Sequence, residues 1–115
     1  GKYDHSTNYR FTPTVAGTYF LYAQIHGKSN ANTQLADMFI FIKKNGTAAF
    51  STRWNPTSNY GNQFSLNIQV TDVANTTDYY EVFAYIDDTS GDPDIDATSL
   101  RGLTSWFGAY KLIGV

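Results

Sequence analysis

The sequence predicts an all-β protein, a two-sheet antiparallel sandwich or jelly roll. Hydrophobic periodicity is two almost throughout, turn-forming residues bound each apolar run, and no segment shows helical periodicity. Aromatic residues make up 17% of the chain and charged residues only 16%, which favours sheets with many turns over helices. A length of 115 residues allows one core, so we treat residues 1–115 as one domain; a closed barrel is the alternative architecture.

The first half of the chain supplies three predicted strands. Residues 1–8, GKYDHSTN, have the composition of a loop, and TYFLYAQIH at 18–26 is rich in aromatic and branched side chains typical of a strand. LADMFIFIKK at 35–44 and TAAFSTRW at 47–54 are the next two strands. Asn45-Gly46 between them predicts a tight hairpin, because primed turns need positive φ at both central positions.

The second half supplies three more strands. SLNIQV at 65–70 alternates apolar with polar residues, so this strand should have one buried face. DYYEVFAYID at 78–87 and LTSWFGAYKLIG at 103–114 are aromatic-rich and are bounded by Gly, Asn, Asp and Pro.

Four of the predicted strands are apolar on both faces. Met-Phe-Ile-Phe-Ile at 38–42 has no polar face, and residues 19–25, 82–86 and 106–113 carry aromatic or aliphatic side chains on both sides. A two-sheet sandwich buries only one face of each sheet, so the second faces need a cover. Single residues of this kind can lie half buried under loops, but the four strands together favour another copy of the domain.

Charge and motif content exclude several function classes. A net charge of -2 gives no basic surface for nucleic acid, and the chain has no cysteine for a disulfide, a thiolate metal site or a Cys nucleophile. Uncharged stretches are too polar for membrane insertion. The sequence markers of a nucleophile elbow, a phosphate-binding loop and a zinc helix are missing, so we expect a protein that is not an enzyme.

Several motifs follow one another in a familiar order over about residues 3–114. YRFTPTVAGTYFLYAQI at 9–25 carries Phe, Pro, Gly and Tyr at positions 11, 13, 17 and 19, and FIFIKKNG at 39–46 holds a Lys-Asn-Gly turn. DYYEVFAYI at 78–86 and TSWFGAYKLIG at 104–114 complete the set. Together they resemble the C1q-like globular head, a jelly-roll domain of the tumour necrosis factor superfamily.

The match has two departures from the family pattern. The closing strand of the family has Gly before its final aromatic residue, where this chain has Ala109. Family domains also begin with an upstream strand, and GKYD resembles the loop after it, so we expect the first N-terminal strand to be missing from this chain. Such a loss leaves a free edge or one that the assembly fills.

The resemblance implies a homotrimer at the end of a stalk, with ligands bound by outer loops. The Lys-Asn-Gly register directs Ile40 and Ile42 into the sandwich core and the neighbouring aromatic residues outward. We therefore expect the trimer interface to contain five aromatic residues: Phe39, Phe41, Phe83, Tyr85 and Tyr110.

An acidic loop is the one candidate for metal binding. It holds five carboxylates, Asp87, Asp88, Asp92, Asp94 and Asp96, whose oxygen atoms suit Ca²⁺. The spacing of Asp92, Asp94 and Asp96 imitates the start of an EF-hand loop, but Ala97 stands where Gly is required and Leu103 where the bidentate Glu belongs. The alternative is a solvated turn-forming loop, and calorimetric titration with Ca²⁺ distinguishes the two.

Trp54 and Tyr60 are the candidate ligand-binding residues. They lie in RWNPTSNYGN at 53–62, where aromatic faces and amides suit a sugar, although Trp54 capping the core explains the same pattern.

The functional hypothesis is a non-enzymatic trimeric recognition or adhesion head at the tip of an extracellular or virion fibre, binding a protein or glycan receptor. The first alternative is a structural trimerisation or sheath module without a ligand. The second is a carbohydrate-active enzyme, which would need paired carboxylates in a cleft.

Overall fold

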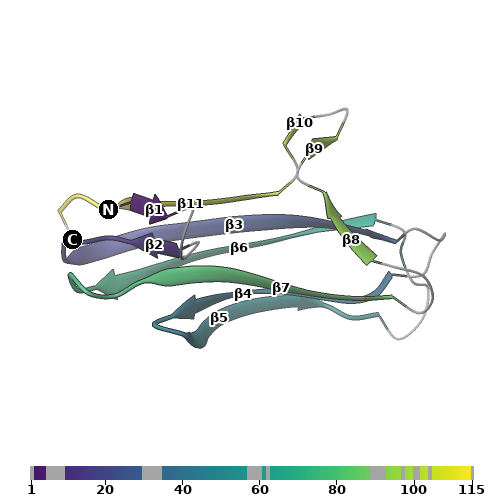
Figure 1. Ribbon diagram of the computed structural model, residues 1–115, viewed down its shortest axis with the longest axis horizontal. Coiled ribbons are helices and arrows are strands. Elements are labelled where there is room, and N and C mark those ends of the chain that lie inside the picture. Colours follow the sequence, from purple (N-terminus) through teal and green to yellow (C-terminus); the bar gives the residue numbers. More distant parts are fainter. Residues whose placement is uncertain are drawn as a thin grey trace.

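The computed structural model describes residues 2–4, 10–29, 35–56, 61, 63–88, 93–96, 98–99, 102–103 and 105–114. Every regular element in these ranges is a β-strand (Figure 1). The strands are β1 (Lys2–Asp4), β2 (Arg10–Thr12), β3 (Gly17–Ser29), β4 (Leu35–Lys44), β5 (Thr47–Trp54), β6 (Gln63–Ala74), β7 (Tyr80–Asp88), β8 (Pro93–Asp96), β9 (Thr98–Ser99), β10 (Gly102–Leu103) and β11 (Trp106–Lys111). A search of the described residues finds no apolar helix of membrane-spanning length.

The strands form two antiparallel sheets that lie one above the other (Figure 1). Within the described ranges, one sheet has the order β1-β2-β7-β4-β5, and the other has the order β11-β3-β6 with β8 also paired to β3. The short strands β9 and β10 pair only with each other in that part of the chain. The predicted all-β sandwich is therefore confirmed.

The core lies between the two sheets and is built by the inward half of each strand. On β4, Met38, Ile40 and Ile42 are fully buried, and on β3, Leu21 has the same environment. The predicted inward direction of Ile40 and Ile42 is therefore confirmed. On β6 the predicted one-faced alternation is also present, because Ile68 is buried while its sequence neighbours are exposed.

The predicted strands agree with the structure best where a tight turn sets their ends. β4 and β5 have the predicted bounds, and the turn between them has φ of 54° at Asn45 and 84° at Gly46. The last strand is shorter than predicted, since β11 ends at Lys111 and Ile113 is 97% exposed beyond it. The expected loop over residues 1–8 is wrong for Lys2–Asp4, which pairs with β2.

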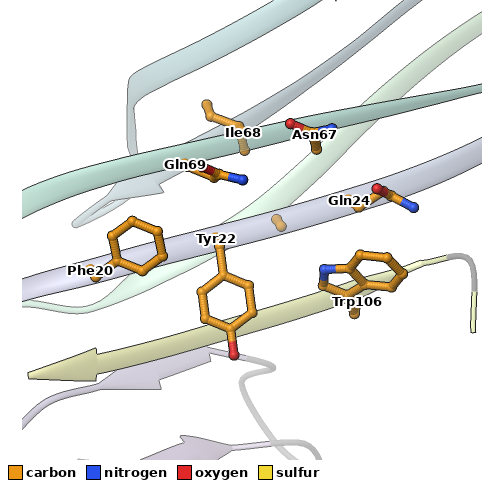
Figure 2. Close-up of a pocket in the computed structure, with 8 residues that line it drawn as sticks. Phe20, Tyr22, Gln24, Asn67, Ile68, Gln69 and Trp106 are labelled. Carbon is orange, nitrogen blue, oxygen red and sulfur yellow. The ribbon is translucent and has the colours of Figure 1, made fainter.

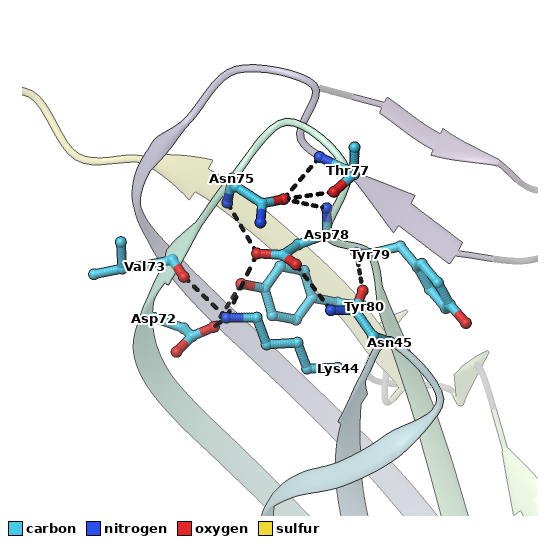
Figure 3. Close-up of polar contacts among 9 residues, drawn as sticks. All are labelled: Lys44, Asn45, Asp72, Val73, Asn75, Thr77, Asp78, Tyr79 and Tyr80. Carbon is cyan, nitrogen blue, oxygen red and sulfur yellow. Dashed lines mark hydrogen bonds and ion pairs between the residues drawn. The ribbon is translucent and has the colours of Figure 1, made fainter.

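A polar cluster joins the β4–β5 turn to the segment between β6 and β7 (Figure 3). The Asn45 side-chain amide donates to Asp78 Oδ1 at 2.8 Å, and its oxygen accepts the Tyr79 backbone N–H at 3.0 Å. Asn75 Oδ1 accepts from the Asp78 backbone N–H at 2.9 Å, while the Asn75 N–H donates to Asp78 Oδ2. These donors lower the pKa of Asp78, with the Asn45 bond as the largest cause.

Lys44 connects the same cluster to β6. Its ammonium lies 2.7 Å from Asp72 Oδ2 and 3.6 Å from Asp78 Oδ2, and it donates to the Val73 carbonyl at 2.9 Å. The hydrogen bond to Asp72 is the main reason that the pKa of Lys44 is raised. Tyr80 donates its hydroxyl proton to Asp72 at 2.6 Å, and burial raises the pKa of Tyr80.

Candidate functional site

Each sheet turns an aromatic-rich face outward, away from the core. Because side chains alternate along a strand, the residues between the buried positions of β3, β4, β7 and β11 point to solvent. The exposed large hydrophobic residues include Phe83 and Tyr85 on one sheet and Trp106 and Tyr110 on the other, each at least 40% exposed. The sequence prediction of strands with two apolar faces is thus confirmed in the geometry.

The outward face of β11, β3 and β6 contains no charged residue over its central rows. The registers place Trp106 beside Gln24 and Asn67, Gly108 beside Tyr22 and Gln69, and Tyr110 beside Phe20 and Thr71, with Thr18 and Val73 in the next row. We call this set the neutral face. The rings of Phe20 and Tyr110 lie 5.2 Å apart, and those of Tyr22 and Tyr110 lie 6.4 Å apart.

A shallow hollow of about 290 Å³ lies at one end of the neutral face (Figure 2). Aromatic rings and amides line it together: Phe20, Tyr22, Trp106, Gln24, Asn67 and Gln69. The rings offer apolar surface and the amides offer both donors and acceptors, without any formal charge. Such a lining favours an uncharged surface or ligand over an ionic one.

The outward face of β4 and β7 carries a stack of rings that we call the aromatic ladder: Phe39, Phe41, Phe83 and Tyr85. Phe39 lies opposite Tyr85 in the register and Phe41 opposite Phe83, with ring centroids 5.0 Å and 5.7 Å apart. Phe39 and Phe41 are 5.6 Å apart along β4. Because each ring stacks on a neighbour, the ladder is ordered before any partner arrives.

Charged groups surround the aromatic ladder. The Arg53 guanidinium lies 5.6 Å from the Phe39 ring centroid, and Lys43 Nζ lies 4.0 Å from that of Phe83. Arg53 donates from Nε and Nη2 to both oxygens of Asp37, at 2.9 Å and 2.8 Å. This hydrogen bonding is the main cause of the lowered pKa of Asp37 and the raised pKa of Arg53.

The five residues predicted for the trimer interface do not lie together. Phe39, Phe41, Phe83 and Tyr85 form the aromatic ladder, whereas Tyr110 lies on the neutral face of the other sheet. The outward faces of a sandwich point in opposite directions, and contacts on opposite sides of a subunit stack copies in a row instead of closing a ring. A single contact between copies would therefore contain the ladder or Tyr110, but not both.

The predicted sugar-binding pair is only partly described. Trp54 ends β5 and stacks on Phe64, with centroids 4.7 Å apart and planes 14° apart. Both rings pack against the buried core, so Phe64 covers one face of the Trp54 indole. Tyr60 lies outside the described residues.

The acidic residues proposed for Ca²⁺ are also spread over several elements. Asp87 is exposed near the end of β7, and the backbone of β8 places Asp94 opposite Lys28 and Asp96 opposite His26. The side chains of Asp88, Asp94 and Asp96, and all of Asp92, lie outside what the structure describes. Within the described part, no group of three or more potential metal ligands occurs.

His26 joins two polar side chains beside the neutral face. Its Nδ1 lies 2.7 Å from Ser65 Oγ, and its Nε2 lies 2.8 Å from Gln63 Oε1. A Ser–His contact is the beginning of an activated nucleophile, but such sites usually orient the histidine with a carboxylate in a cleft. Among the described side chains an amide fills that role, and the contacts are exposed; the backbone of β8 places Asp96 opposite His26, with its side chain outside the described part. The described contacts of His26 are surface hydrogen bonds.

Sequence reasoning missed the Asp37–Arg53 pair and the neutrality of the face around Tyr110. Counting back from Asn45-Gly46 would set Arg53 opposite Met38. The β-bulge between Ile42 and Lys43 shifts the register by one residue and brings Arg53 opposite Phe39, next to Asp37, so the pair has no local signal. The neutral face needed the pairing of β3 with both β6 and β11, which no local motif reveals. No protein-family model matches the chain and a search of curated proteins returns no significant match, so the geometry carries the functional argument.

Proposed function

We propose that this domain is a non-enzymatic recognition head of the C1q-like jelly-roll type, which assembles as a trimer through its neutral face. Its place would be the tip of an extracellular or virion fibre, where it binds a receptor. The connectivity supports the jelly-roll assignment, because the chain alternates between the sheets: β2, β4, β5 and β7 lie in one, and β3, β6 and β11 in the other.

The absence of charge on the described neutral face is the observation that carries the trimer proposal. In a threefold assembly each residue near the axis meets two copies of itself, so charged side chains there would repel one another. The central rows of β11, β3 and β6 bring only aromatic, amide, hydroxyl and aliphatic groups. Trp106 and Tyr110 are 42% and 53% exposed, an apolar surface of the kind that self-association covers.

The aromatic ladder fits the trimer contact less well. Ionised groups stand at both ends of it, with Arg53 and Asp37 at one end and Lys43 opposite Glu81 at the other. Threefold symmetry would repeat each of these charges around the contact, and their desolvation costs free energy. We therefore assign Tyr110 to the interface and leave the ladder on the outside of the trimer.

Two single substitutions on opposite faces test the assembly. Tyr110→Asp places a carboxylate on the neutral face and should convert the trimer to a monomer in light scattering. Phe83→Asp makes the same chemical change on the aromatic ladder and should leave the trimer mass unchanged. A trimer that survives Tyr110→Asp, or one that only Phe83→Asp dissociates, would overturn the assignment of the contact face.

A further inference from the structure

The aromatic ladder presents apolar ring surface to water on the side opposite the proposed trimer contact. Phe83 and Tyr85 are 40% and 45% exposed, and each is held against a ring of β4. Among the described residues, β2 pairs with β7 only through Phe11 and Tyr80, and β8 contacts β7 without pairing with it. The exposure of the two rings lets a ligand approach the ladder from above the sheet.

A fixed polar group adjoins the rings. Arg53 uses two of its five N–H donors on Asp37, and its side chain is 58% exposed, which leaves donors directed to solvent. The row Tyr85, Phe39, Arg53 runs directly across β7, β4 and β5. Ring surface and a planar hydrogen-bonding group thus stand side by side on one rigid sheet.

The charges of this face are balanced. Arg53 is paired with Asp37, Glu81 lies 4.0 Å from Arg10 and opposite Lys43, and Asp87 lies opposite Asp37 in the register of β4 and β7. The described face thus carries three cations and three carboxylates, so it lacks the excess positive charge that acidic ligands need. Electrostatic complementarity therefore favours an uncharged ligand that still forms many hydrogen bonds.

We propose that the aromatic ladder and the Asp37–Arg53 pair together bind a neutral glycan. A pyranose ring has an apolar C–H face that packs on Tyr85, because the Lys43 ammonium already lies over the Phe83 ring, and an edge of hydroxyl groups that reaches Arg53 and Asp37. A peptide strand that paired with the edge of β7 through main-chain hydrogen bonds would leave Arg53, two strands away on β5, unused. A folded protein partner buries about 800 Å² on each side and would also have to desolvate the charged groups at both ends of the ladder, which costs free energy.

The glycan site extends the proposed function and rests on it, because the ladder must face outward in the trimer. Three identical sites on one trimer would act together on a receptor that displays repeated glycans. The apparent affinity of the trimer for a glycan-covered surface should exceed the affinity of one site by about a hundredfold or more, because the second and third contacts become intramolecular.

An array of immobilised oligosaccharides is the first test. The panels are neutral hexose and N-acetylhexosamine oligomers, sialylated glycans and sulfated glycans. We expect selective binding within the neutral panel, followed by a measurable affinity for the best oligomer in isothermal titration. Binding to the acidic panels alone, or to none of the panels at millimolar concentration, would overturn the glycan proposal.

Variants then locate the site. Tyr85→Ala combined with Phe83→Ala should weaken the affinity for that oligomer about tenfold or more, a loss of about 1.4 kcal/mol or more, because it removes the exposed ring surface. Arg53→Lys keeps the charge but removes the fork and should also weaken binding. Ile113→Ala is the matched control, because it removes an apolar side chain that is 97% exposed outside both faces. Equal affinities in all variants would place the site elsewhere.

The monomeric variant separates this proposal from the trimer proposal. Tyr110→Asp should retain the affinity of the wild type for a soluble oligomer and lose only the gain on the array surface. If Tyr110→Asp stays trimeric, the assembly is wrong while the titration still tests the ladder. If it becomes monomeric and neither it nor the wild type binds any neutral oligomer, the assembly stands and the glycan site fails.

Discussion

The ring of Tyr22 on β3 lies directly over Gly108, its cross-strand partner on β11. A Cβ atom built at position 108 would overlap the Cζ and hydroxyl oxygen of that ring. Only glycine leaves this space, so the Tyr22 ring can lean across β11 between Trp106 and Tyr110. Gly108 therefore determines the shape of the neutral face, although it has no side chain of its own.

Gly108→Ala should weaken the trimer. The added methyl group displaces the Tyr22 ring outward and disturbs the surface that the copies share, so the trimer should dissociate at higher protein concentration in sedimentation or light scattering. Tyr22→Ala combined with Gly108→Ala provides the control, because the methyl group then has no ring to displace. If the two substitutions act additively instead of compensating, the overlap has no role in assembly.

Neighbouring positions on β4 should respond very differently to truncation. Ile40 is fully buried, so Ile40→Ala should lower the free energy of unfolding by about 2–5 kcal/mol. Phe41 is half-buried on the outward side, and Phe41→Ala should cost less because water already reaches the ring. Urea unfolding at one fixed protein concentration measures both, since trimer formation makes stability depend on concentration. A larger loss from Phe41→Ala would indicate that the ladder is covered in solution.

The strands and their inward faces could be predicted because they are local properties of the chain. The period of two identified the inward positions of β4 and β6, and Asn45-Gly46 set the ends of β4 and β5, since both depend only on adjacent residues. β1 escaped prediction because three residues carry too little pattern, and its pairing partner on β2 lies beyond an intervening segment.

The partition of outward residues between two faces could not be predicted in the same way. Tyr85 and Tyr110 have the same local pattern, but β7 joins the sheet of β4 while β11 joins that of β3. That choice depends on long-range pairing, which periodicity does not report. The functional hypothesis consequently grouped aromatic residues that the fold places on opposite sides of the sandwich.

Stability should fall at acid pH through Asp78. Its folded-state pKa lies below the ordinary value of 3.8, so the unfolded chain takes up the proton at a higher pH than the folded chain does. The stabilisation is therefore complete above about pH 5 and is lost as the pH falls through 3.8 and below. Asp78→Asn should be less stable at pH 7 and show a flatter decline in urea midpoint between pH 5 and pH 2.5. An unchanged decline would assign the acid loss to other carboxylates, such as Asp37.

Stability should also fall at alkaline pH, through Lys44 and Tyr80. The pKa of each is raised in the folded protein, from ordinary values of 10.5 and 10.0, so folding retains a proton that the unfolded chain releases. This contribution is fully present below about pH 10 and is lost as the pH rises through the folded pKa values. Tyr80→Phe removes the titrating hydroxyl but keeps the buried ring, so its thermal midpoint should decline less between pH 9.5 and pH 11.

Lys44→Met should already be less stable at pH 7, because it leaves Asp72 and Asp78 without their shared cation. If both variants lose stability with rising pH as steeply as the wild type, the polar cluster around Lys44 and Tyr80 does not control alkaline unfolding.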